Sequence, residues 1–168
     1  MSYQAKRTIV SIITGAAVLA AYCIYAFGPG RAGALASGDL KFWAITMLKF
    51  IGIGVAVTIV IQIVFHILLS VSVAIKKKIQ DQNCADEDIE KSIGAEMVED
   101  EMDKLIELKS TRVGYIFAGI GVVAGLVSLV LDYSPAVMLN IVFISFCAGS
   151  LLEGFAQLYF YRRGIRNA

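Results

Sequence analysis

The side chains on which most enzymes depend are scarce in this chain. Its 168 residues include one histidine and three cysteines, Cys23, Cys84 and Cys147, which have no paired spacing. This spacing argues against a disulfide framework or a zinc site, since both need matched sets of ligands. His66 cannot hold a metal alone, and haem ligation by two histidines would need two copies of the chain. With no recognisable catalytic or nucleotide-binding motif either, we predict a protein that is not an enzyme and carries no cofactor.

Charged residues are also few, and their signs nearly cancel. Only 17% of the residues are charged, and the net charge is +1. A balance so close to neutral predicts no binding of nucleic acid. Hydrophobic residues make up 58% of the chain, which leaves too little polar surface to cover a large water-soluble domain. We therefore expect the lipid bilayer to be the main partner.

Four long apolar stretches fill most of the chain, at residues 8–27, 50–75, 113–131 and 136–160. Each reaches or exceeds the roughly 19 to 20 residues that a helix needs to cross a hydrocarbon core about 30 Å thick. In lipid, backbone groups must satisfy one another, so these stretches are expected to be helices. The sequence predicts an all-α polytopic protein, with residues 1–168 as a single membrane domain of four helices arranged as two hairpins.

The first stretch also resembles a signal peptide, because Lys6 and Arg7 precede it. However, its apolar run is longer than a typical signal core. Tyr22 is also too bulky for the position before Cys23 in a lipoprotein cleavage site. We expect this stretch to be retained as the first membrane span.

Basic residues are distributed unequally between the predicted loops. Twelve of them lie before the first span, between residues 76 and 112, or after the fourth span, whereas Arg31 and Lys41 lie in loops on the opposite side. Positively charged flanks resist translocation, which predicts that both termini of this multi-pass protein lie in the cytoplasm. The second span has an ambiguous start, since residues 42–49 are suited to an interfacial turn of helix that precedes it.

The predicted cytoplasmic connection, residues 76–112, carries eleven acidic and seven basic residues and is expected to be partly helical. Apolar residues at helical spacing indicate an amphipathic helix between the second and third spans, which is able to run on into the third. This face is a candidate docking surface for a protein partner or another copy of the chain, and the alternative is packing against the protein's own inner surface. Membrane-surface attachment is less suited to so acidic a helix. The face consists of Val98, Met102, Leu105 and Ile106.

Two of the predicted spans carry a ridge of small or polar residues at four-residue intervals. Side chains at positions i and i+4 lie on one face of a helix, so each ridge is expected to face the interior of the bundle. The two ridges are Thr58, Gln62, His66 and Ser70 in the second span, and Ser145, Gly149, Glu153 and Gln157 in the fourth.

Glu153 is the only acidic residue within a predicted span, and His66 is expected at a similar depth. Charge in hydrocarbon is costly and marks functional sites, which suggests a proton or cation site of Glu153 and His66. The side chains expected to line that site are Gln62, Gln157, Ser70 and Ser145. The alternative interpretation is structural: these groups form interhelical hydrogen bonds, and Glu153 extends toward the arginines that follow the fourth span.

The third predicted span is rich in small residues, namely Gly114, Ala118, Gly121 and Gly125. Gly121 and Gly125 form a GxxxG pattern, which permits close approach of two helix backbones. The pattern is compatible with packing inside the chain and with packing between two copies.

Two hairpins around a charged segment, ending in Leu158-Tyr159-Phe160-Tyr161-Arg162-Arg163-Gly164, resemble the small uncharacterised four-span membrane proteins of bacteria and archaea. The resemblance implies a four-helix bundle in the cytoplasmic membrane, such as the bacterial inner membrane, and supplies no activity. The small multidrug transporters match poorly, because their membrane glutamate lies in the first helix. Our leading hypothesis is a protein that acts by self-association or as an accessory to a membrane or cytoplasmic partner. The alternative is a small proton-linked transporter or channel.

Overall fold

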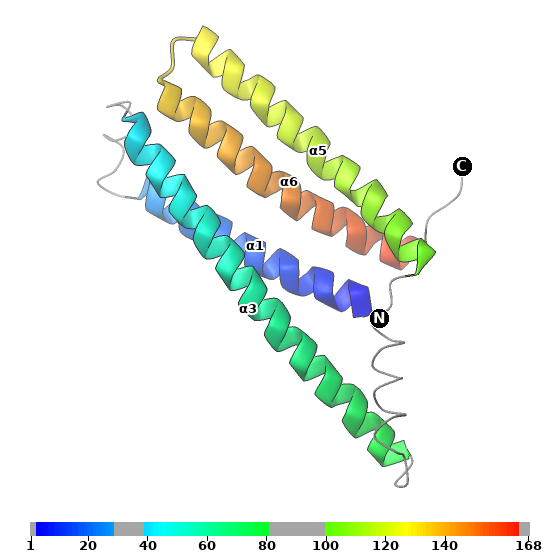
Figure 1. Ribbon diagram of the computed structural model, residues 1–168. Coiled ribbons are helices and arrows are strands. Elements are labelled where there is room, and N and C mark those ends of the chain that lie inside the picture. The colour runs from blue at the N-terminus through cyan, green and yellow to red at the C-terminus, as the bar shows by residue number, and fades with distance from the viewer. Residues whose placement is uncertain (1–2, 29–38, 81–99, 165–168) are drawn as a thin grey trace.

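The computed structural model describes residues 3–28, 39–80 and 100–164, and every regular element in these ranges is an α-helix. The four helices are α1 (Tyr3–Phe27), α3 (Leu40–Gln80), α5 (Glu101–Val130) and α6 (Pro135–Arg163), shown in Figure 1. All four are long and apolar enough to cross a membrane. The prediction of an all-helical chain with four helices of spanning length is therefore confirmed.

The helices begin and end at residues suited to those positions. The Asp39 carboxylate accepts a hydrogen bond from the Phe42 backbone amide at the start of α3. Asp100 and Asp103 form a reciprocal capping box at the start of α5, in which each side chain accepts from the other's backbone amide. Gly164 follows α6 with a φ of 71°, a conformation that glycine adopts without a steric penalty.

All four helices are longer than the predicted spans, and α3 and α5 exceed them the most. α3 starts at Leu40 and runs without a break through residues 42–49, where no glycine or proline interrupts it. Residues 101–112 form the first turns of α5, so the helix before the third span runs on into it, which was one of the predicted possibilities. Most of the connection that precedes them lies outside the described residues.

α6 lies between α5 and α1, and its closest packing is with α5 (Figure 1). The two helices run antiparallel, and small residues bring their backbones together. A Cβ atom built on Gly149 would lie 2.7 Å from the carbonyl oxygen of Gly114, and one built on Gly121 would overlap the Ser145 side chain. Gly125 faces Met138 in the same way. The small-residue face of the third span therefore packs within the chain.

The end of the bundle near the α5–α6 turn holds an apolar core. Tyr22 and Trp43 are completely buried there, together with Ala26, Met47 and Ala136. The Tyr22 hydroxyl donates a 2.7 Å hydrogen bond to Asn140 Oδ1, and the Asn140 amide donates to the Ala136 carbonyl. This pairing satisfies the buried hydroxyl of Tyr22 and joins α1 to α6.

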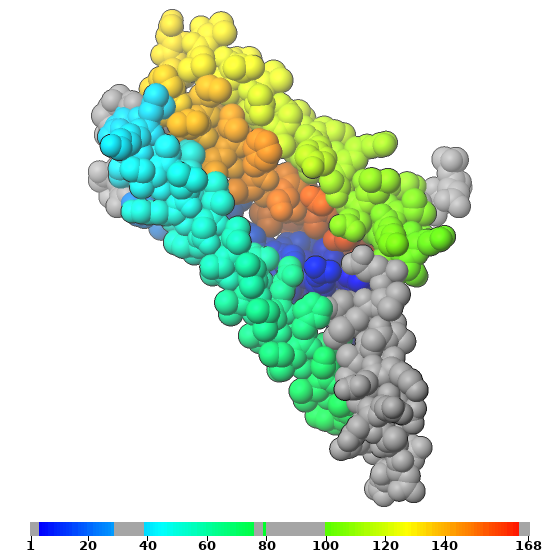
Figure 2. Space-filling model, viewed as in Figure 1, coloured from blue at the N-terminus to red at the C-terminus, as the bar shows by residue number. Residues whose placement is uncertain are grey.

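α3 separates from the bundle toward its C-terminal end. It contacts α1 and α6 in its first half, where Val18 lies 3.5 Å from a Cβ built on Gly54. In its most apolar stretch no residue is buried within the chain. Figures 1 and 2 show the green half of α3 extending beyond the other three helices.

Candidate functional site: a polar cavity among four helices

A cavity of about 400 Å³ lies among the four helices, between the charged end of the bundle and its middle. Its size is within the usual range for small-ligand sites. Apolar and small residues, Val18, Leu19, Gly54 and Cys147 among them, line its inner part. The polar lining comes from every helix: Gln4, Arg7, Thr8 and Ser11 of α1, Thr58 and Gln62 of α3, Asp103 and Glu107 of α5, and Ser150, Glu153, Gln157 and Tyr161 of α6.

The cavity gathers part of both predicted polar ridges. Glu153 and Gln157 of α6 share it with Thr58 and Gln62 of α3. On α3 these are the ridge residues nearer the start of the helix, and on α6 the other two ridge residues, Ser145 and Gly149, face α5 instead.

The remaining members of the predicted site do not line this cavity. His66 and Ser70 of α3 are half-buried but fall outside the lining, on the part of α3 that separates from the other helices. Ser145 donates to the carbonyl of Ile141 in its own helix and lies against Gly121. The structure therefore groups Glu153 with amides and hydroxyls instead of with the imidazole of His66.

Glu153 is held against α5. Its Oε1 accepts a 2.6 Å hydrogen bond from the Thr111 hydroxyl, and its Oε2 lies 3.0 Å from a Cβ built on Gly114. A larger residue at position 114 would crowd the carboxylate and the Gly149 carbonyl, which lies 3.2 Å from the same Cβ. The close crossing of α5 and α6 thus positions the acid as well as joining the helices. Arg163, one of the arginines expected to attract Glu153, instead contacts the ring and hydroxyl of Tyr159.

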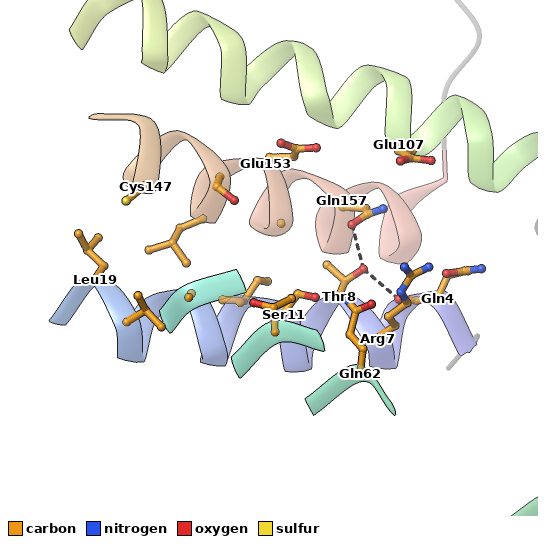
Figure 3. Close-up of a pocket in the computed structure, with 18 of the residues that line it drawn as sticks. Gln4, Arg7, Thr8, Ser11, Leu19, Gln62, Glu107, Cys147, Glu153 and Gln157 are labelled. Carbon is orange, nitrogen blue, oxygen red and sulfur yellow. Dashed lines mark hydrogen bonds between the residues drawn. The ribbon is translucent and has the colours of Figure 1, made fainter. Parts of the chain in front are cut away.

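Gln157 joins α6 to α1 across the mouth of the cavity. The Thr8 hydroxyl lies 2.9 Å from Gln157 Oε1 and 2.9 Å from the Gln4 carbonyl oxygen, as Figure 3 shows. A hydroxyl has one proton to donate. The two contacts are satisfied together when the Gln157 amide is turned so that its NH₂ group donates to Thr8.

The sequence interpretation missed the polar residues of two helices. On α1, Gln4, Thr8 and Ser11 follow helical spacing at the start of the first span, for which no polar face was predicted. On α5, Asp103 and Glu107 precede Thr111 at intervals of four and were assigned to a separate cytoplasmic segment. Extending the i, i+4 rule across both boundaries would have identified these faces.

The predicted docking face is divided by the structure. Ile106 is 2% exposed and packs into the chain, whereas Met102 and Leu105 are exposed for about half of their surface. Val98 lies outside the described residues. Among residues 3–28, 39–80 and 100–164, no three His, Cys, Asp or Glu side chains converge on a point where a metal ion would bind.

Comparison of this chain with protein-family models, with curated proteins and with solved structures found no match. The site is therefore interpreted from its own chemistry.

Proposed function

We propose that this chain is a non-enzymatic, multi-pass protein of the cell membrane with both termini in the cytoplasm. Four helices of spanning length support this placement. The start of α1, the start of α5 and the end of α6 lie at one end of the bundle (Figure 1), and the predicted cytoplasmic basic residues flank the same helix ends. Such a bias supports a cytoplasmic location for that end.

Labelling in intact cells tests this topology. In a chain whose native cysteines are replaced by serine, Tyr133→Cys in the α5–α6 turn should react with a membrane-impermeant maleimide added outside. Leu105→Cys near the start of α5 should react only after the cells are opened. The two positions are both exposed, at 57% and 46%. The reverse pattern, or tags at Met1 and Ala168 accessible from opposite sides, would contradict the proposal.

We further propose that the cavity takes up protons or small cations in a minimal proton-linked transporter. The observation that carries this proposal is the convergence of Glu153 with polar side chains from all four helices on one cavity. Three carboxylates line the cavity, those of Asp103, Glu107 and Glu153, whereas Arg7 is the one basic residue in its described lining. An excess of negative charge favours the binding of cations.

The two ends of the bundle support a transporter over an open channel. Arg7, Asp103 and Glu107 bring the cavity to the charged end. At the other end, the packed core around Tyr22 and Trp43 closes the path. A site open to one side is one state of an alternating-access cycle, in which one group of helices rocks against another. Proton flux into liposomes with and without the Glu153 carboxylate is the decisive measurement.

Self-association is the second candidate function, and the separated half of α3 favours it. This half carries Ser72 at an exposed position of the predicted span, one turn after the exposed Leu68, and polar side chains within spans favour contact with another helix over contact with lipid. A second copy packed along α3 would provide such a helix.

Cysteine crosslinking in native membranes tests the association. Leu68→Cys on α3 should give crosslinked dimers in a chain that lacks its native cysteines, whereas Val123→Cys on the outer face of α5 should give few. The two side chains are almost equally exposed, at 64% and 61%, so random collision would crosslink both. Equal yields at the two positions, or purification as a monomer without any partner, would count against association.

A further inference from the structure

A second cavity, of about 350 Å³, lies at the charged end of the bundle, between the starts of α1 and α5 and the end of α6. It shares only Asp103 and Tyr161 with the lining of the first cavity, and the Tyr161 hydroxyl donates a 2.9 Å hydrogen bond to Asp103 between them. The proposed transport function does not use this second space.

The polarity of its lining changes in the same direction along α5 and α6. On α5 the charged Asp100 and Asp103 come first, and Ile106 follows one turn deeper. On α6 the exposed Arg162 lies at the helix end, and Leu158 lies one turn deeper. α1 contributes the apolar Ala5 and Ile9. The cavity therefore has a charged outer rim and an apolar inner wall, which is the order of polarity in a phospholipid.

The charges on the rim distinguish between headgroups. Arg162 supplies a guanidinium, which binds a phosphate oxygen pair well. Asp100 and Asp103 supply carboxylates, which attract an ammonium group and repel a second negative charge. Asp103 accepts hydrogen bonds on both carboxylate oxygens, from Tyr161 and from the Asp100 amide, whereas Asp100 accepts the Asp103 amide on Oδ1, so its Oδ2 is the more available acceptor. A headgroup with both a phosphate and a primary amine matches this set.

We infer that the second cavity binds the headgroup of phosphatidylethanolamine. Its phosphate contacts Arg162, its ammonium contacts Asp100, and the start of an acyl chain lies along Ile9, Ile106 and Leu158. A phosphatidylglycerol headgroup offers the carboxylates hydroxyl groups but no positive charge, and the quaternary amine of phosphatidylcholine has no N–H group to donate. The inference rests on the proposed placement in the membrane, with this end of the bundle at headgroup level, but it does not depend on transport.

Native mass spectrometry of the purified full chain, titrated with the three phospholipids carrying identical acyl chains, tests this inference. We expect phosphatidylethanolamine to bind about tenfold more tightly than the other two, a ratio that corresponds to about one charge-assisted hydrogen bond. Arg162→Gln should remove most of this binding. Asp100→Asn should abolish the preference over phosphatidylcholine while keeping α5 capped, because asparagine is also a good N-cap residue.

Arg163→Gln is the matched control, since it removes the same charge from the neighbouring position. Arg163 stacks on Tyr159 at 5.4 Å and does not line the cavity, so this variant should bind lipid as the parent does. Equal binding of the three lipids, a preference for phosphatidylglycerol, or equal losses in the two arginine variants would overturn the inference. A chain that binds phosphatidylethanolamine selectively but conducts no protons would retain the lipid site and refute only the transport proposal.

Discussion

Glu153→Gln is expected to reduce proton flux through the reconstituted protein to the rate of protein-free liposomes. The amide has the shape of the carboxylate and still accepts the hydrogen bond from Thr111, which in the parent measures 2.6 Å. It cannot bind and release a proton, however. A loss of flux in a variant that keeps its fold would therefore identify the carboxylate as the proton-carrying group, because charge inside a span is otherwise rare and costly.

The measurement uses liposomes that contain a pH-sensitive dye and hold a potassium gradient, with valinomycin added to set a negative potential inside. The parent should acidify the interior faster than protein-free liposomes do. Glu101→Gln is the control, because it makes the same change at an exposed position of α5 that lines neither cavity. We expect this variant to keep most of the parent's rate. Equal rates for Glu153→Gln and the parent, or a parent rate no higher than that of bare lipid, would contradict the transport proposal.

The sequence predicted where the helices lie in the chain better than it predicted where they begin and which of them pack together. Length and hydropathy sufficed to locate four helices, since any apolar segment that long must satisfy its own backbone in lipid. Breaks were harder to predict. The continuous α3 and α5 depend on the absence of a glycine or proline near residues 42–49 and 101–112, and a change from polar to apolar composition does not end a helix there.

The same distinction explains which part of the candidate site was predicted. Four-residue spacing sets the face on which a side chain lies, so Gln62, Glu153 and Gln157 were placed toward the interior and do line one cavity. His66 was expected beside Glu153 because both lie at a similar distance from the charged end. Equal depth brings side chains together only when the helices stay parallel. The tilt of α3 away from α6 is set by packing that one sequence does not reveal.

Gly121→Ala is expected to destabilise the folded bundle by about 1 to 3 kcal/mol, the usual cost of overfilling a packed interface. The added methyl group would overlap the Cβ and Oγ atoms of Ser145, and the helix backbones have no room to separate while Gly149 lies against Gly114. Alanine favours helices more than glycine does, by roughly 1 kcal/mol. A net loss of stability would therefore show that the methyl group overlaps Ser145. Thermal unfolding in detergent, followed by circular dichroism, measures the difference.

Gly119→Ala is the control, because a Cβ at that position of α5 meets nothing within 4 Å. It should leave stability unchanged or raise it slightly. A second substitution separates steric overlap from other causes of instability. Ser145→Gly removes the side chain that the new methyl group would overlap, so Gly121→Ala should cost little stability in that background.

The oligomeric state of the Gly121→Ala variant also distinguishes the two uses of a GxxxG face. If the face packs against α6 of the same chain, the variant loses stability while its crosslinking through α3 is unchanged, because Leu68 lies on another helix. A variant as stable as the parent but unable to associate would instead place Gly121 between two copies. That outcome would require α5 and α6 to separate from the arrangement in which Gly121 lies against Ser145.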